Sequence, residues 1–478
     1  MKRIKHDLVV IGAGSAGYAA ARTAHDFGCD VALADRGPLG GLCILRGCMP
    51  SKTLLASSDA LYDAREARAL GIGASRLSAD VAFIACRKRR LVDEFAAFRV
   101  AGIEAFPLYR GDARFVSPRE VAVGEDVVLE APRFVIATGS TISAQALPGL
   151  EESGYVDSDG VLELESIPKS VIVLGGGYTA CELGQYLARL GARATMLVRS
   201  SHLLTQSDDD IGITLTECFR EEGIDVVTGC ALVYASRRGS KKVVEFSRDG
   251  ATHEVAADEI FYALGRTPNI AGLELEKANV RCHGSAIGVD ATLRTSNRDI
   301  FAVGDVTGEY MLVHVAIYQG EVAARNACLD GEEKADYRLT AAHTVFCDPQ
   351  VASAGMSEKM LQGEHQPYVK GRYDFAEHGK AQCLGKTKGF VKMLADPQSG
   401  RILGASAIGA EASELIHETI VAMTFEATVA EFMRIPHLHP TLAEIWTYPA
   451  EECAAKIGLR KPGDEQVELA TSIAERRP

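Results

Sequence analysis

Residues 6–17 read HDLVVIGAGSAG, and this stretch decides the fold of the chain. Its apolar half predicts a strand over residues 6–11, its glycines predict a tight turn, and the residues after them predict a helix that ends near Phe27. A second short strand, Val31–Ala34, follows and ends at Asp35. A strand, a glycine turn, a helix and a second strand in this order form a parallel unit that binds a dinucleotide.

The same pattern occurs a second time. Residues 170–174 predict a strand, residues 175–177 are three glycines, and a predicted helix continues to about Leu190. The second strand of this copy, Arg193–Val198, ends at Arg199. One glycine pattern alone is weak evidence, but two, each between a strand and a helix, predict two dinucleotide-binding sites.

Each small residue of the pattern has its own role. The first glycine makes the turn, the second lets the backbone approach a pyrophosphate, and the third position, Gly17 or Ala180, lets the helix pack closely on the strand. The pyrophosphate then lies at the N-terminus of a helix. The candidate binding residues of the two turns are Gly12, Gly14, Ser15, Gly17, Gly175 and Gly177.

The residues that end the second strand of each unit differ in charge. Asp35 can accept hydrogen bonds from both ribose hydroxyls, so FAD fits the first site. Arg199 stands at the equivalent position of the second unit, where a cation suits a 2′-phosphate, so the sequence favours NADP over NAD. Ser200, Ser201 and His202 are candidates to assist Arg199.

Two cysteines lie shortly after the first unit, in residues 40–52, GGLCILRGCMPSK. Five residues of helix rise about 7.5 Å, more than the roughly 7 Å that a disulfide tolerates between Cα atoms, so the backbone must leave a regular helix between Cys43 and Cys48. Gly47 supplies this freedom, and Pro50 suits the first turn of a following helix. Cys48 then lies at a positive helix end that favours its thiolate, which predicts a redox-active pair and no metal site.

A redox-active cysteine pair needs a hydride carrier and a proton donor. Hydride and disulfide chemistry have to meet at a flavin, because no side chain transfers a hydride by itself. We expect Cys48 to lie nearest to the flavin and Cys43 to exchange with the substrate. His439 is the expected proton acceptor and donor, and Glu444 is expected to orient its ring. Lys52 follows the cysteines closely and is expected to contact the flavin.

Two further blocks complete the chain. Residues 297–305, NRDIFAVGD, predict a buried strand that ends in Gly304 and Asp305, an arrangement that places a carboxylate beside a ligand. The last part of the chain contains alternating strands, such as residues 390–394 and 402–408, followed by helices.

The composition of the 478-residue chain excludes several classes of protein. The length is enough for about three domains. The net charge of −13 argues against nucleic acid or an anionic membrane as the main partner, and no apolar run is long enough for a transmembrane helix. Because a single pair among the twelve cysteines has an informative spacing, we expect a reducing, cytoplasmic location. The polar stretch 459–478 is expected to be peripheral.

The order of these motifs resembles that of the FAD-dependent pyridine nucleotide–disulfide oxidoreductases over nearly the whole chain, including Ala137-Thr138-Gly139 and Gly265-Arg266-Thr267-Pro268. The resemblance implies an α/β fold with two Rossmann-like dinucleotide-binding domains, for FAD and NAD(P), and a C-terminal α+β dimerisation domain. The implied boundaries are residues 1–145 for the FAD-binding domain, 146–270 for the NAD(P)-binding domain, 271–338 for a central domain that completes the FAD site and 339–478 for the interface domain.

The resemblance also implies roles for individual residues. Lys52 is implied to pair with Glu182 near the flavin, Asp305 to bind the ribityl chain, and His439 with Glu444 to act across a homodimer interface, so that each active site uses both subunits. The implied cofactor-binding residues are Gly12, Gly14, Ser15, Gly17, Asp35, Gly41, Cys43, Lys52, Thr138, Gly139, Gly304, Asp305, Met311, Leu312 and His314 for FAD, Gly175, Gly177, Glu182 and Arg199 for the pyridine nucleotide, and Gly265.

Within the family the chain is most similar to dihydrolipoyl dehydrogenases, which implies dihydrolipoamide or lipoamide as the substrate. The similarity lies in Arg46 within the cysteine loop, in Ser51 and Lys52 after it, and in the spacing of Met311 and His314.

Three alternatives stay open. Arg199 stands where typical dihydrolipoyl dehydrogenases place an acid for NADH, which leaves the nucleotide and the substrate undecided. The first is an NADPH-dependent reductase of another disulfide, as in glutathione reductases. The second is a reductase of Hg(II); His439 and the lack of a cysteine after Cys453 count against it. The third is a redox-silent flavoprotein with a structural role, which the intact cysteine pair disfavours.

Overall fold

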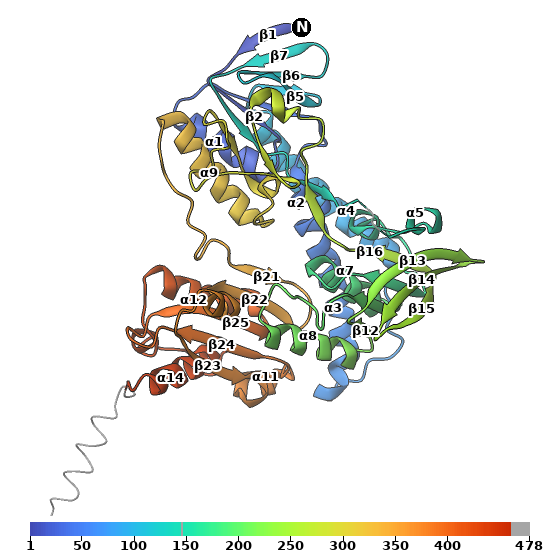
Figure 1. The fold of residues 1–478 in the computed structure, drawn as a ribbon. Helices are drawn as coiled ribbons and strands as arrows, with labels where there is room; N and C mark the ends of the chain where they lie inside the picture. The colour runs from blue at the N-terminus through green and yellow to red at the C-terminus, as the bar shows by residue number, and fades with distance from the viewer. Residues whose placement is uncertain (145–146, 460–478) are drawn as a thin grey trace, which may run out of the picture.

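The structure is a computed structural model that describes residues 1–144 and 147–459, and it divides into three lobes (Figure 1). The blue N-terminal strands and the yellow helix α9 share the first lobe, the green elements form the second, and the orange and red elements form the third. The polar stretch 459–478, with its expected peripheral position, lies outside the described residues apart from Leu459. None of the described helices is long and apolar enough to cross a membrane.

The first lobe is built on a five-stranded parallel sheet. Its strands are, in spatial order, β20 (Ile300–Ala302), β8 (Arg133–Ile136), β2 (Leu8–Ile11), β3 (Val31–Asp35) and β4 (Leu108–Arg110). Strand β2 is buried along its whole length, as expected for a parallel strand covered on both faces by helices. It begins two residues later than predicted, because the backbone N–H of His6 donates instead to Glu130 O of a neighbouring sheet at 3.0 Å. Helices α1 (Ser15–Asp26) and α9 (Val313–Leu329) pack against each other.

Smaller elements surround this sheet. A second sheet has the order β1 (Lys2–Lys5), β7 (Val127–Glu130), β6 (Glu120–Val123) and β5 (Ala113–Ser117). The cysteine motif forms α2 (Gly41–Arg46) and α3 (Cys48–Glu66), and the long helix α4 (Val81–Ile103) follows. The short elements are the strand pairs β9 (Ser140–Ile142) with β17 (Arg266–Pro268) and β18 (Cys282–His283) with β19 (Ala286–Ile287), and the 3₁₀ turns η1 (Ala67–Leu70), η2 (Leu275–Ala278) and η3 (Gly304–Thr307).

The second lobe contains a four-stranded parallel sheet and a three-stranded antiparallel sheet. The parallel strands are β12 (Asp225–Thr228), β11 (Arg193–Val198), β10 (Ser170–Leu174) and β16 (Glu259–Tyr262), and the antiparallel ones are β13 (Ala231–Arg238), β14 (Lys241–Arg248) and β15 (Ala251–Ala257). Its helices are α5 (Leu150–Ser153), α6 (Ser158–Leu162), α7 (Tyr178–Arg189) and α8 (Asp209–Glu221). Strands β10 and β11 have the bounds that the sequence predicts.

The third lobe is an antiparallel sheet covered by helices. Its strands are, in spatial order, β21 (His343–Val345), β22 (Gln350–Gly355), β25 (Ile402–Gly409), β24 (Phe390–Ala395) and β23 (Val369–Asp374). Its helices are α10 (Glu358–Gly363), η4 (Phe375–Glu377), α11 (Gly379–Leu384), α12 (Ala412–Thr424), α13 (Val429–Phe432), η5 (Ala443–Trp446) and α14 (Thr447–Lys456). Two parallel α/β lobes and an α+β lobe confirm the predicted fold class.

One hydrophobic core joins the helix of the cysteine motif to the other lobes. Leu54 and Leu55 of α3 are buried with Tyr186 of α7 in the second lobe and with Phe390 of β24 in the third. Burial of apolar side chains is the main stabilising term of such a contact. Helix α3, which begins at Cys48, is therefore held in a fixed place between the lobes.

A further cysteine pair lies beside the contact of α1 with α9. The structure bonds Cys29 to Cys328, which are separated by 299 positions in the chain and whose Cα atoms lie 6.5 Å apart. This pair is additional to the Cys43 and Cys48 pair that the sequence predicts. Spacing along the chain could not reveal this pair, since the packing of two distant helices brings it together.

Candidate functional site

A cleft of about 440 Å³ lies at the carboxyl ends of β2 and β3 in the first lobe. The predicted FAD-binding residues that line it are Gly12, Gly14, Ser15, Asp35, Gly41, Cys43, Thr138, Gly139, Gly304, Asp305 and Met311. Cys48 lines it as well. This edge of a parallel sheet is where ligands of doubly wound α/β folds bind.

Gly12 and Gly17 of the first turn, and Gly41 of the cysteine motif, lie where other backbone segments approach too closely for a side chain. Gly12 has φ +98°, and a Cβ there would lie 2.4 Å from Ala137 O. Gly41 has φ +78°, and a Cβ there would lie 2.8 Å from the Cα of Gly14. Gly17 does not line the cleft; a Cβ on it would lie 1.8 Å from Gly12 O, so its role is the close packing of α1 on the turn.

The Asp35 carboxylate is held in place at one end of the cleft. Its Oδ2 accepts a hydrogen bond from the backbone N–H of Ala13 at 2.7 Å, and its Oδ1 accepts one from Gly37 N–H at 2.6 Å. A carboxylate oxygen can accept more than one hydrogen bond, so both atoms keep capacity for ribose hydroxyls. The residues present therefore fit the adenosine half of FAD.

Asp305 belongs to a polar network elsewhere in the same cleft. Ser140 Oγ donates to Asp305 Oδ2 at 2.6 Å, and Arg266 Nε donates to Ser140 Oγ at 2.9 Å. Burial lowers the pKa of Arg266. Ser140 and Arg266 were not predicted as site residues, although Arg266 belongs to the motif Gly265-Arg266-Thr267-Pro268. Gly265, a predicted cofactor-binding residue, does not line the cleft.

The cysteines lie on consecutive helices with a break between them. Helix α2 ends at Arg46, Gly47 has φ −132° and ψ −117°, and α3 begins at Cys48. A Cβ on residue 47 would lie 3.1 Å from the Cα of Cys43, so a glycine lets the chain fold back at this point. The break predicted from the spacing is present, and Cys48 lies at the start of α3, where the helix dipole favours a thiolate.

Cys43 and Cys48 are half-buried free thiols, and each shifts the pKa of the other. The hydrogen bond that the Cys43 thiol donates, with help from the Lys52 ammonium, lowers the pKa of Cys48 to about 7. The same hydrogen bond, together with burial, raises the pKa of Cys43. At neutral pH Cys43 therefore keeps its proton, and Cys48 is close to half ionised.

Lys52 joins the cysteine helix to the second lobe. Its Nζ donates to Glu182 Oε2 at 2.7 Å, which is the expected ion pair. Glu182 is buried on α7, and its Oε1 accepts a hydrogen bond from Phe346 N–H at 2.9 Å. Lys52 Nζ also lies 4.5 Å from the centre of the Phe346 ring. Lys52, Leu312 and His314 do not line the flavin-sized cleft.

The second glycine turn has the same geometry as the first. Gly175 has φ +120°, and a Cβ there would lie 2.5 Å from Ala263 O. Arg199 is exposed at the end of β11. His202, expected to assist it, is buried instead, and its Nε2 lies 3.1 Å from Asp209 Oδ1.

His439 and Glu444 form a pair on the third lobe. The Nδ1 of His439 lies 3.0 Å from Glu444 Oε2, and the imidazole is 80% exposed while the carboxylate is 14% exposed. Glu444 Oε1 lies 3.6 Å from Nε2 of the buried His378, whose pKa is lowered by burial. His439 does not line the cleft that contains Cys43. The sequence offers no signal for His378, because its contact depends on the fold.

Family models match most of the chain. Residues 6–320 match the pyridine nucleotide-disulphide oxidoreductase model, and residues 341–450 match the dimerisation domain of pyridine nucleotide-disulphide oxidoreductases. The chain belongs to this family.

Family members with different activities are similar to the chain over almost its full length. The dihydrolipoyl dehydrogenase of Chlamydia muridarum is 34% identical over 453 residues, which are 93% of this chain and 96% of the relative. The mercuric reductase of Bacillus cereus is 31% identical over 443 residues, which are 92% of this chain and 70% of the relative. Among solved structures, the Cu(II) complex of the HOCl-induced flavoprotein disulfide reductase RclA from Escherichia coli has a TM-score of 0.82 and 25% identity, and it covers 94% of this chain and 99% of its own.

Membership of this family indicates that the cofactor of the cleft is FAD. The pyridine nucleotide-disulphide oxidoreductase is an FAD-dependent enzyme that uses NAD(P) and a disulfide redox centre. The glycine cradle, the anchored Asp35 and the Asp305 network of this chain fit FAD, and the two thiols stand at the same cleft.

Proposed function

We propose that this oxidoreductase interconverts a dihydrolipoamide-type dithiol and a lipoamide-type disulfide. NAD(P) accepts the electrons in one direction, and NAD(P)H supplies them in the other. The observation that carries the proposal is the pair of free thiols, Cys43 and Cys48, that lines the FAD cleft on two consecutive helices, with the pKa of Cys48 lowered to about 7. The dihydrolipoyl dehydrogenase of Chlamydia muridarum, 96% of which is covered, supports the choice of substrate.

The two cysteines have different tasks in this reaction. One substrate thiolate attacks Cys43 in the oxidised pair and releases Cys48 as the thiolate, and the second substrate thiolate then breaks the mixed disulfide and releases Cys43. Bound FAD supplies two-electron transfer between the cysteine pair and the nicotinamide. Cys48 leaves readily because its pKa is lowered by the hydrogen bond from Cys43 and by Lys52. Cys43, with its raised pKa, requires a proton donor as it leaves.

His439 is the proposed donor of that proton, and it acts on the cysteines of a second copy. Glu444 holds its Nδ1 and leaves Nε2 on the exposed side of the ring. Exposed apolar side chains on the same lobe, Phe425 and Leu438, support a homodimer that buries this surface. In that dimer the partner subunit's His439 serves Cys43, so neither subunit has a complete site alone.

NADPH is the proposed nucleotide. Arg199 ends β11, next to the second glycine turn, and its side chain is exposed and available to a 2′-phosphate. An acidic residue at position 199 would instead favour the free ribose hydroxyl of NADH.

A second small cleft favours a second candidate function. This cleft of about 80 Å³ is lined by Arg22, Arg99 and Glu321, and Ser15 lines both it and the FAD cleft. Arg99 is close enough for its charge to act on Cys43. Two cations against one carboxylate in this cleft suit a substrate with carboxylate groups. The second candidate is therefore an NADPH-dependent reductase of an anionic disulfide.

A substrate panel tests both candidates. The purified FAD-loaded protein is assayed with dihydrolipoamide and oxidised NAD or NADP, and with lipoamide, glutathione disulfide, other small disulfides and Hg(II) and NADH or NADPH. The highest kcat/KM is expected for dihydrolipoamide. A higher value for an anionic disulfide, together with its loss in Arg99→Gln, would establish the second candidate, and turnover of Hg(II) alone would overturn both.

A further inference from the structure

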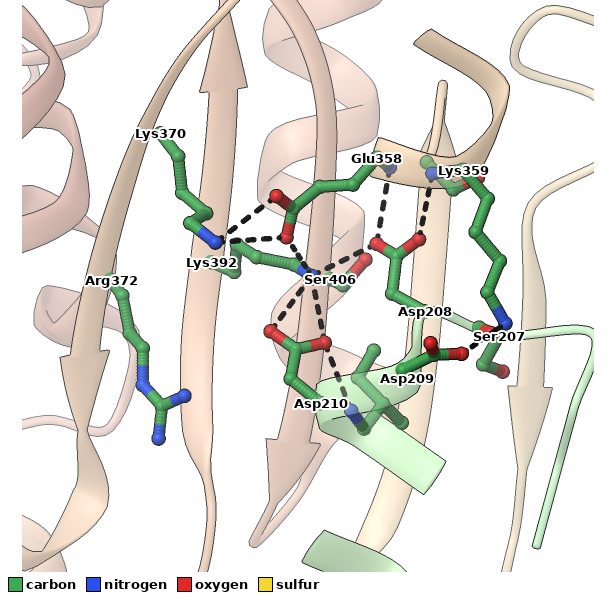
Figure 2. A network of polar contacts seen from close by, with 12 residues as sticks. Ser207, Asp208, Asp209, Asp210, Glu358, Lys359, Lys370, Arg372, Lys392 and Ser406 are labelled. Carbon is green, nitrogen blue, oxygen red and sulfur yellow. Dashed lines mark hydrogen bonds and ion pairs between the residues drawn. The ribbon is translucent and has the colours of Figure 1, made fainter. Parts of the chain in front are cut away.

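Lys392 of β24 is fully buried and lies among three carboxylates (Figure 2). Its Nζ donates to Asp208 Oδ2 at 2.9 Å, to Asp210 Oδ1 at 2.9 Å and to Glu358 Oε1 at 2.8 Å. The three carboxylates would repel one another in a buried position without this ammonium, so breaking the contact costs far more than breaking a surface ion pair. Asp208 and Asp210 lie at the start of α8, so Lys392 fixes the second lobe to the third.

Lys359 of α10 makes a second connection of the same kind (Figure 2). Its Nζ donates to Thr205 O at 3.0 Å and to Ser207 O at 2.6 Å, and it lies 2.7 Å from Asp209 Oδ1. Its backbone N–H donates to Asp208 Oδ1 at 3.1 Å. The third lobe thus holds the backbone of the chain between β11 and α8, residues 199–208.

The 199–208 segment lies against the second glycine turn. The N–H of Leu204 donates to Gly176 O at 2.8 Å, and a Cβ on Gly176 would lie 3.2 Å from a methyl carbon of Leu203. Arg199 begins the segment, and its exposed side chain forms no ion pair within residues 1–144 and 147–459. The position of its guanidinium therefore depends on how the backbone of the segment is held.

We propose that Lys359 and Lys392 are positioning residues for the pyridine nucleotide: from the third lobe they hold the 199–208 segment, and with it Arg199, against the second glycine turn. The inference rests on the proposed role of Arg199 in binding the 2′-phosphate. The two lysines come from the domain that matches the dimerisation model, and a contact from this domain to the nucleotide segment makes nucleotide affinity depend on the packing of two lobes.

Lys359→Met is the informative variant, because its side chain is 38% exposed and its contacts are to backbone carbonyls of the segment and to the exposed Asp209. Loss of these hydrogen bonds should raise the KM for NADPH and the Kd for NADP about five-fold, with kcat at saturating NADPH changed less than about two-fold. Lys359→Arg keeps donors at this position and should restore most of the affinity. Lys392→Met should have a larger effect in the same direction.

Lys370→Met is the matched control. Lys370 is 42% exposed and contacts the Glu358 carboxylate at 3.0 Å, on the side away from the 199–208 segment (Figure 2). The Lys370→Met substitution removes one positive charge from the same network of ion pairs. It therefore reports any long-range electrostatic effect on the nucleotide phosphates. Its KM for NADPH should match that of the wild type.

A measurement without nucleotide separates this inference from the proposed function. Reduction of the bound flavin by dithiol, FAD content and thermal midpoint should be unchanged in Lys359→Met. Wild-type affinity in Lys359→Met, or an equal loss in Lys370→Met, would overturn the inference and leave the proposed function intact. A wild-type protein that binds neither NADP nor NAD in a direct titration would overturn both.

Discussion

The ammonium of Lys52 and the buried carboxylate of Glu182, 2.7 Å apart, connect the helix that begins at Cys48 to the helix that follows the second glycine turn. The pair acts on Cys48 with two opposite charges: the Lys52 charge lowers the pKa of the thiol and the Glu182 charge raises it. Both residues therefore set how much thiolate is present at neutral pH.

The pH dependence of Cys48 alkylation should report this balance. In the dithiol-reduced wild type the rate should rise with pH to a midpoint near 7, because the hydrogen bond from Cys43 and the charge of Lys52 lower the pKa to about 7. Lys52→Met should move the midpoint to higher pH and slow the reaction at pH 7 several-fold, and Glu182→Gln should move it to lower pH. Rates are measured by peptide mapping at Cys48, and equal midpoints in the two variants would contradict the assignment.

Serine substitutions should distinguish the two thiols. Cys48→Ser should abolish the long-wavelength absorbance that a thiolate beside an oxidised flavin gives, and Cys43→Ser should retain it, because Cys48 is the thiol with the lowered pKa. Each variant should lose turnover of dithiol by about 10³-fold or more. Spectra of the FAD-loaded proteins check the first point, and an inverted pattern would exchange the roles.

Mixed dimers should show whether His439 serves the other subunit. Cys43→Ser and His439→Ala are each expected to be nearly inactive, with His439→Ala lowered about 10²- to 10⁴-fold. When the two variants are unfolded and refolded together, random pairing gives one intact site in half of the dimers, so about a quarter of wild-type activity should return. Refolding each variant alone is the control, and no recovery in the mixture would mean that the pair acts within one subunit.

The Cys29–Cys328 bond should stabilise the first lobe. It closes a loop of 299 residues, and long loops give the largest entropic effect, about 5 kcal/mol in the chain-entropy description. A thiol reductant should therefore lower the thermal midpoint of the wild type by several degrees but leave that of Cys328→Ser unchanged. Cys86→Ser, which changes an exposed free thiol, is the control and should behave as the wild type.

Local patterns in the sequence predicted those parts of the site that consecutive residues build. The bounds of β10 and β11, the left-handed turns at Gly12 and Gly175 and the helix break at Gly47 follow from short-range sterics and periodicity. These features need no knowledge of the rest of the fold.

Contacts between segments that are distant in the chain could not be predicted from the sequence. Lys392 meets carboxylates about 180 positions away, the partner of Cys29 is 299 positions away, and Arg266 reaches Ser140 across 126 positions. Such pairs leave no periodic signature in one sequence, because they are fixed by the packing of whole lobes. The burial of His202 could not be predicted for a related reason. A histidine three positions after Arg199 gives the same sequence pattern whether its ring faces a ligand or packs against α8.

The sheet of the first lobe receives its strand β20, residues 300–302, only after the entire second lobe has been passed in the chain. A ribosome therefore releases a complete second lobe while the first still lacks an edge strand next to β8. Asp305 comes three residues after that late strand, so the flavin site is completed only after the second lobe has been synthesised, and a nascent chain stopped before residue 300 presents an open sheet edge in place of a cofactor cleft.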